Sequence, residues 1–72
     1  MSGLKFREKY GEYLTGKRKE KGLTLKQLSE KTGIPERNLL AVETENVKNF
    51  SHNTVHEFCK ALGVHLGEIF YD

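Results

Sequence analysis

The side chains best suited to metal chemistry are His52, His56 and Cys59, which lie four and three residues apart. At these spacings they could share one face of a helix. A structural zinc site, however, usually has four ligands in a closed shell. A cysteine beside Phe58 more often packs as a small hydrophobic residue. We therefore expect no metal site and no cofactor.

The sequence also lacks the groupings that catalysis requires. No nucleophile–base pair, glycine-rich phosphate loop or pair of carboxylates stands out among the 72 residues. A chain of this length buries only about 60% of the surface that its unfolded form exposes, which leaves little room for a deep cleft. We expect a protein that is not an enzyme and has no small-molecule substrate.

A polar cluster at Glu36, Arg37 and Asn38 is better suited to reading DNA bases. Arginine can hydrogen-bond O6 and N7 of guanine, asparagine an adenine edge, and glutamate the N4 amino group of cytosine. Ala41 follows one helical turn later. The alternative is a solvated surface, and Glu36 also favours a helix N-terminus for local electrostatic reasons.

The elements around this cluster form a helix-turn-helix pattern. Thr24 predicts an N-cap, and a glutamine three residues later completes a capping box. The helix is expected to run to about Thr32, where Gly33 supplies the positive φ of a helix stop. Pro35 suits the start of the next helix. We place the helix-turn-helix at about residues 24–43.

Along the chain, apolar residues recur at spacings of three and four residues. This pattern predicts a compact all-α domain that covers residues 1–72, with five short helices and no strands. The expected helices span about residues 4–20, 24–32, 35–43 and 51–62, with a last short turn over 64–70. Residues 44–50 are expected to form a loop. The residues expected in the core include Phe6, Tyr10, Leu14, Leu25 or Leu28, Val55, Phe58, Cys59, Leu62 and Ile69.

The charge is unevenly placed along the chain. Residues 1–36 hold nine Lys/Arg and five Glu, a net charge of +4, whereas residues 37–72 hold three Lys/Arg and five Asp/Glu, a net charge of −2. The basic first half fits a phosphate-facing surface, and it fits a solvated lysine-rich face equally well. No apolar run approaches the roughly 20 residues of a membrane span. With one cysteine and no signal-peptide pattern, we expect a cytoplasmic protein with no membrane contact.

The run GLTLKQLSEKTGIPERNLLAVE, followed by ALGVHLGEIF, resembles the lambda repressor/Cro-like helix-turn-helix family, also called XRE-type. The resemblance covers about residues 10–70. The matching positions are Gly22-Leu23-Thr24, Leu28, Gly33, Val42-Glu43 and Ala61-Leu62-Gly63-Val64. It implies a five-helix lambda repressor-like domain, usually dimeric, that binds operator DNA as a transcriptional regulator, often in the genetic switch of a phage or mobile element.

The resemblance also implies an ion pair between Arg18 and Glu43. In the family, this pair joins the first helix to the end of the third and orients the arginine toward a phosphate. We expect its role here to be mainly structural, since buried pairs more often specify packing than perform chemistry.

Three departures from the family pattern affect phosphate binding. Leu25 stands where the family commonly has a glutamine that touches a phosphate. Thr44-Glu45-Asn46 replaces the usual Arg or Asn followed by Gly, and the loop to the fourth helix is a residue or two longer. Because phosphate contacts supply most non-specific affinity, we expect weaker DNA binding with a flatter salt dependence.

Two functions from different classes remain open. In the first, the protein binds double-stranded operator DNA. In the second, it is an antirepressor that binds a partner phage repressor, because residues 36–46 carry Arg37 against three glutamates. The residues expected to contact DNA or such a partner are Lys26, Gln27, Glu36, Arg37, Asn38, Ala41, Thr44 and Lys48.

The C-terminal segment is rich in apolar residues. Leu66, Phe70 and Tyr71 form a candidate protein interface, because they exceed what a small core needs. With the chain ending at residue 72, any homodimer, or heterocomplex with a phage repressor, is expected to form through the helical domain itself. A homodimer would place two reading helices about 34 Å apart on a pseudo-palindrome.

Overall fold

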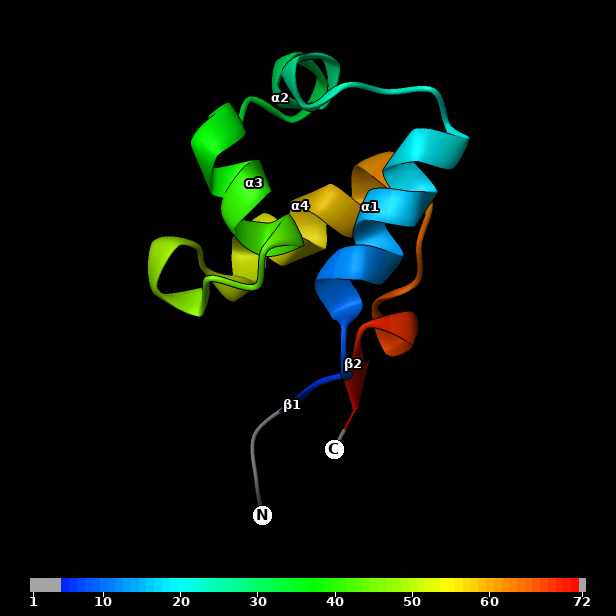
Figure 1. Ribbon diagram of the computed structural model, residues 1–72, viewed down its shortest axis with the longest axis vertical. Coiled ribbons are helices and arrows are strands. Elements are labelled where there is room, and N and C mark those ends of the chain that lie inside the picture. The colour runs from blue at the N-terminus through cyan, green and yellow to red at the C-terminus, as the bar shows by residue number, and fades with distance from the viewer. Residues whose placement is uncertain (1–4, 72) are drawn as a thin grey trace.

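The computed structural model describes residues 5–71. Its four α-helices surround one core, and the two ends of the chain meet below them in a short antiparallel sheet (Figure 1). The elements in chain order are β1 (Lys5–Phe6), α1 (Tyr10–Glu20), α2 (Leu25–Thr32), α3 (Glu36–Glu43), the 3-10 turn η1 (Val47–Asn49), α4 (His52–Leu62), the 3-10 turn η2 (Leu66–Glu68) and β2 (Phe70–Tyr71).

The all-α class is confirmed, with four α-helices instead of the predicted five. Gly63 adopts a positive φ of 71° and ends α4 as predicted. Only six residues then separate it from β2, so the last predicted helix is reduced to the single turn η2. Core residues come from all four helices and from the C-terminal segment: Tyr10, Leu14, Leu28, Leu39, Val42, Val55, Phe58, Cys59, Leu62, Val64, Ile69 and Phe70.

The start of the chain differs from the prediction. The first helix begins at Tyr10 and not near residue 4, because Lys9 takes a left-handed conformation with a φ of 58°. Phe6 therefore lies in β1, paired with Phe70 of β2, and its ring stacks on Tyr10 at a centroid distance of 4.2 Å. The sequence predicted no strand, since two residues are too few to show an alternating pattern.

The predicted turn chemistry between α2 and α3 is present. Thr24 Oγ1 accepts a hydrogen bond from the Gln27 N–H at 3.1 Å, and Gln27 Oε1 accepts from the Thr24 N–H at 2.9 Å. Gly33 ends α2 with a φ of 78°. Ser29, whose role the sequence did not reveal, donates its hydroxyl proton to the Ile34 carbonyl. The turn is therefore fixed by side chains as well as by the glycine.

Gly11 allows α1 to approach the end of α3 closely. A Cβ atom at this position would lie 2.2 Å from the carbonyl oxygen of Glu43, a distance that no side chain can occupy. A glycine within a helix by itself indicates only a weakened helix. The structure shows that Gly11 sets the distance between two helices.

The C-terminal expectations are partly wrong. Phe70 is only 9% exposed and packs in the core, so it is not available as an interface residue. Leu66 is exposed, as an interface residue would be. The side chain of Tyr71 lies outside the described residues. Within residues 5–71, no helix has the length and apolar character needed to cross a membrane.

Candidate nucleic-acid interface

Helix α3 presents one face to solvent and packs the other on the core. Leu39 and Val42 are fully buried. At 100° per residue, the exposed residues fall in one arc with Leu40 near its middle. The members of this arc, here called the α3 exposed face, are Glu36, Arg37, Leu40 and Thr44.

Ala41, predicted to contact a base, is not on the α3 exposed face. It is only 6% exposed. The Asn46 N–H donates to the Ala41 carbonyl at 2.8 Å and, with Glu45 in a left-handed conformation, closes the end of α3. Leu40, which the sequence did not single out, is 49% exposed and takes the place expected of Ala41.

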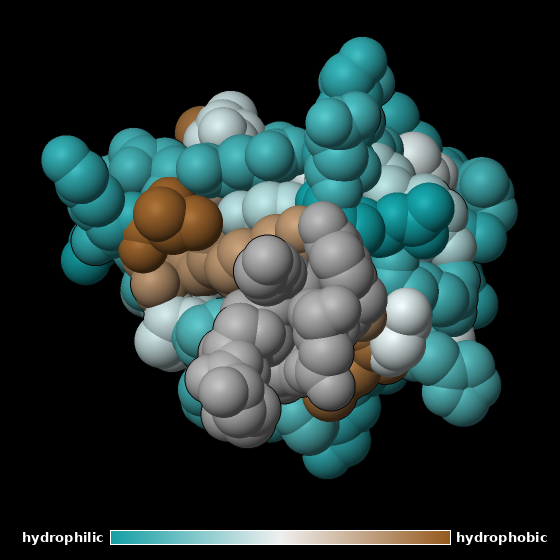
Figure 2. Space-filling model, turned by 90° about the horizontal axis from the view of Figure 1, so that it is seen from below, coloured by the Kyte–Doolittle hydropathy of each residue, from teal (hydrophilic) through white to brown (hydrophobic). Residues whose placement is uncertain are grey.

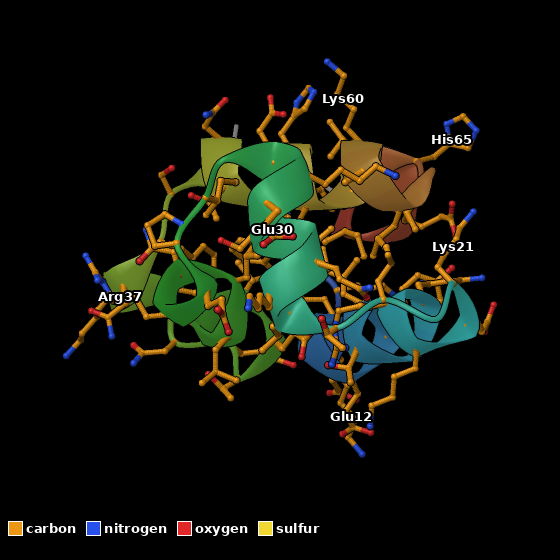
Figure 3. The ribbon with its side chains drawn as sticks, turned by 90° about the horizontal axis from the view of Figure 1, so that it is seen from above. Glu12, Lys21, Glu30, Arg37, Lys60 and His65 are labelled. Carbon is orange, nitrogen blue, oxygen red and sulfur yellow. The ribbon has the colours of Figure 1, made fainter. Side chains whose placement is uncertain are left out.

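Arg37 lies at the beginning of α3 and projects away from the body of the molecule (Figure 3). Within residues 5–71 it takes part in no ion pair. Asn38 is half-buried beside it, and these two side chains line a shallow hollow together with Asn49. The guanidinium group is therefore free to reach a ligand, whereas Asn38 is the more confined of the two.

The predicted phosphate contacts differ in what they offer. Lys26, Gln27 and Lys48 are exposed. Gln27 accepts through Oε1 in the capping box, so its NH₂ group is the part left to donate to a phosphate. Thr44 donates its hydroxyl proton to the Leu40 carbonyl at 2.9 Å, so in this rotamer it offers a phosphate no donor. Leu25 is half-buried and packs against the core. At this position the side chain therefore contributes apolar packing and offers no donor to a phosphate.

The ion pair that the resemblance implies is present. Arg18 Nε donates to Glu43 Oε2 at 2.6 Å and Nη2 to Oε1 at 3.3 Å, while Nη1 donates to the Leu23 carbonyl at 2.6 Å. The Arg18 and Glu43 side chains are only 12% and 6% exposed. This cluster joins α1, the connection before α2 and the end of α3, and the Glu43 charge is neutralised within it.

Glu45 is also occupied within the fold. Its Oε2 accepts a hydrogen bond from the Gly11 N–H at 3.1 Å, at the first turn of α1. A carboxylate is favourable at this positive end of a helix. Glu45 reaches this position from a left-handed backbone conformation with a φ of 60°, which most side chains avoid. No sequence signal indicated this contact with Gly11.

The basic residues that end α1 are not gathered around Arg37. Figure 3 shows Lys21 and His65 on the side of the molecule opposite Arg37. Lys17 lies over the ring of Tyr13, with its Nζ 5.3 Å from the ring centroid. Lys21 therefore does not form one basic patch with Arg37.

Glu68 anchors the C-terminal turn to the first helix. Its carboxylate accepts hydrogen bonds from the Tyr13 hydroxyl and, at 3.0 Å, from the His65 N–H. These two hydrogen bonds lower the pKa of Glu68, and the bond to the carboxylate raises the pKa of Tyr13. Arg7 donates to the Glu68 carbonyl at 2.8 Å. This cluster stabilises the fold on a side that does not include α3.

The α4 side chains suited to metal chemistry, His52, His56 and Cys59, do not share one face of the helix. Cys59 is 1% exposed and points into the core, whereas His52 and His56 are exposed and line a groove with Leu66 and Phe70. The ring of His52 stacks on Phe6 at 5.4 Å. Seen from below, apolar surface extends along this end of the molecule (Figure 2).

The capped helix α2, the fixed turn and the exposed face of α3 together define a helix-turn-helix of the DNA-binding class. The sequence model of a protein family, the Cro/C1-type helix-turn-helix DNA-binding domain, matches residues 14–72. The chain belongs to this family, so the predicted relationship and the DNA-binding class are confirmed. Searches of curated proteins and of solved structures found no match.

Proposed function

We propose that this protein is a transcriptional regulator of the Cro/repressor type that recognises operator DNA with α3, in the genetic switch of a phage or mobile element. The observation that carries the proposal is Arg37, an exposed arginine in the first turn of α3 that projects from a rigid helix-turn-helix. In such motifs, the first turn of the second helix contacts base edges in the major groove. Arg37 reads a guanine, with Glu36 and Asn38 beside it.

The charges near α3 favour DNA over a repressor protein as the partner. The acidic character of residues 36–46 was the main support for an antirepressor. Glu43 is paired with Arg18, and Glu45 accepts from Gly11. Glu36 is then the one carboxylate of this segment on the α3 exposed face, where Arg37 offsets its charge.

The number of phosphate donors sets the expected strength of binding. Lys26, Gln27 and Lys48 are exposed and available, whereas Leu25 and Thr44 offer no donor. Each neutralised phosphate contributes about −0.9 to the slope of log K against log salt concentration. Lys26 and Lys48 are the two charged contacts among these, so the slope is about −2 for each protomer bound.

A homodimer completes the proposed function, since two α3 helices about 34 Å apart match successive major grooves on one side of DNA. Leu66 and Val47 are exposed apolar residues, and each lines a hollow together with His52. Figure 2 shows apolar surface at the lower end of the molecule. The apolar surface at this end is where we place the contact between two copies.

The proposal is tested by fluorescence anisotropy with a duplex selected from a random library and with a shuffled duplex, between 50 and 200 mM salt. We expect submicromolar binding to the selected duplex and at least tenfold weaker binding to the shuffled one. The substitution Arg37→Ala reduces this difference, because one of the recognised bases loses its contact. Lys60→Ala, at an exposed lysine of α4, serves as the charge-matched control and leaves it unchanged.

Micromolar or weaker binding to both duplexes, with no dependence on Arg37, would exclude operator recognition. The antirepressor function would then be established if the protein forms a complex with a phage repressor encoded by a neighbouring gene, and if Arg37→Ala abolishes that complex.

A further inference from the structure

Leu40 is a large apolar side chain on the part of the molecule that faces DNA under the proposed function. It is 49% exposed and lies near the middle of the α3 exposed face. An exposed leucine by itself needs no explanation. A leucine at the centre of a face that contacts base edges does need an explanation, because it can neither donate nor accept a hydrogen bond there.

The core does not account for this side chain. Leu39 and Val42 fill the core from α3 and are fully buried. Leu40 is neither in the core cluster nor among the partly buried residues that pack against it. Its backbone carbonyl accepts from the Thr44 N–H and hydroxyl, both at 2.9 Å, and this role requires no particular side chain.

The neighbours on the α3 exposed face define what Leu40 can recognise. Arg37 precedes it by three residues, and Thr44 follows it by four with its hydroxyl proton turned back to the helix. The part of this face that follows Arg37 along α3 therefore presents apolar surface in place of hydrogen-bond donors. The apolar feature of the major groove is the C5 methyl group of thymine, which aliphatic side chains contact.

We infer that Leu40 packs on a thymine methyl group and makes this base a determinant of specificity. The inference rests on the proposed function and adds a second base to the one read by Arg37. Residues three apart on a helix lie about 5–6 Å apart at their Cβ atoms. Base pairs are stacked about 3.4 Å apart. The thymine is therefore within one or two base pairs of the guanine that Arg37 contacts, on either strand.

The test uses the selected duplex and a set of copies in which one thymine at a time is replaced by deoxyuridine, which keeps base pairing and lacks the methyl group. We expect one position in each half-site to bind the wild-type protein about three- to tenfold more weakly, as for the loss of one buried methyl contact. The remaining positions change binding less than twofold.

Two variants link this effect to the side chain. Leu40→Ala should bind the thymine duplex and the sensitive deoxyuridine duplex equally well, since it has no side chain that reaches the methyl group. Leu40→Met, with similar volume and apolar character, should retain the discrimination. Thermal unfolding of both variants checks that they fold, which is expected because the side chain lies outside the core.

The inference is overturned if no single thymine is sensitive, or if Leu40→Ala keeps the wild-type discrimination. Either result leaves operator recognition by Arg37 standing. Failure of the proposed function is a different observation, because then the protein enriches no duplex from the library at all.

Discussion

At the scale of single residues, the charges around α3 fall into two groups. The Glu43 side chain is buried and paired with Arg18, whereas Glu45 is exposed and accepts a hydrogen bond from the first turn of α1. Arg37 and Glu36 remain on the α3 exposed face. Net charge counted along a segment therefore misjudges which charges a partner meets, and the structure assigns each one separately.

Arg37 carries the first prediction. Replacing it with alanine removes a bidentate contact to guanine, so affinity for the selected duplex should fall by about 1–3 kcal/mol. Preference at one base pair of each half-site should be lost, as measured by binding to the four base-pair variants at every position. Arg37→Lys keeps the charge without the fork, so it should retain non-specific affinity and still lose the preference. Uniform weakening at all positions would instead identify Arg37 as a phosphate contact.

Cys59 makes stability depend on pH in the alkaline range. Burial, with a smaller contribution from the Glu68 charge, raises the pKa of the thiol from 9.0 to about 11. Between these values the unfolded chain has lost a proton that the folded chain keeps, so the free energy of unfolding should fall as the pH rises from about 9 to about 11. Urea unfolding at several pH values measures this. Cys59→Ala should be less stable at neutral pH but show a shallower decline, and an unchanged decline would assign the effect to another group.

At the scale of elements, the close approach of α1 to α3 fixes the position of α3. Gly11→Ala would place a Cβ 2.2 Å from the Glu43 carbonyl oxygen, so the helices must move apart. We expect a loss of about 1–3 kcal/mol, or more, in the free energy of unfolding. Gly16→Ala in the same helix is the matched control, because its Cβ meets nothing within 4 Å and should stabilise by about 0.5–1 kcal/mol. Equal effects at both sites would contradict the close contact.

Helices α2, α3 and α4 could be predicted from the sequence, because the residues that begin and end a helix act on positions only a few residues away. The Thr24 capping box and the Gly33 stop both act over three to five positions, and the structure contains both. Contacts between distant segments were not predictable in this way. The pairing of Phe6 with Phe70 and the contact of Glu45 with Gly11 depend on the tertiary arrangement.

The exposed face of α3 was predicted to within one residue. Helical spacing placed a contact one turn after Arg37, which both position 40 and position 41 satisfy. Only the tertiary packing decides between them, since it leaves Ala41 6% exposed and Leu40 49% exposed. The longer loop was visible in the sequence, but its direction was not.

At the scale of the whole molecule, the proposed homodimer makes a geometric prediction. Two half-sites one helical turn apart face the same side of the duplex. Inserting about five base pairs between them places the second half-site on the opposite side, so affinity should fall to that of a single half-site. A protein that binds as independent monomers would show no change, and sedimentation of the complex gives its stoichiometry as a control.

The central claim is that the α3 exposed face meets DNA, and NMR titration of the ¹⁵N-labelled protein with the selected duplex tests it most directly. The account predicts the largest chemical-shift changes at Arg37, Leu40 and Thr44 in α3 and at Lys26 and Gln27 in α2. Lys21 and His65, on the side away from Arg37, should change little (Figure 3). Changes concentrated on the side of Lys21 and His65, with α3 unaffected at saturating DNA, would contradict it.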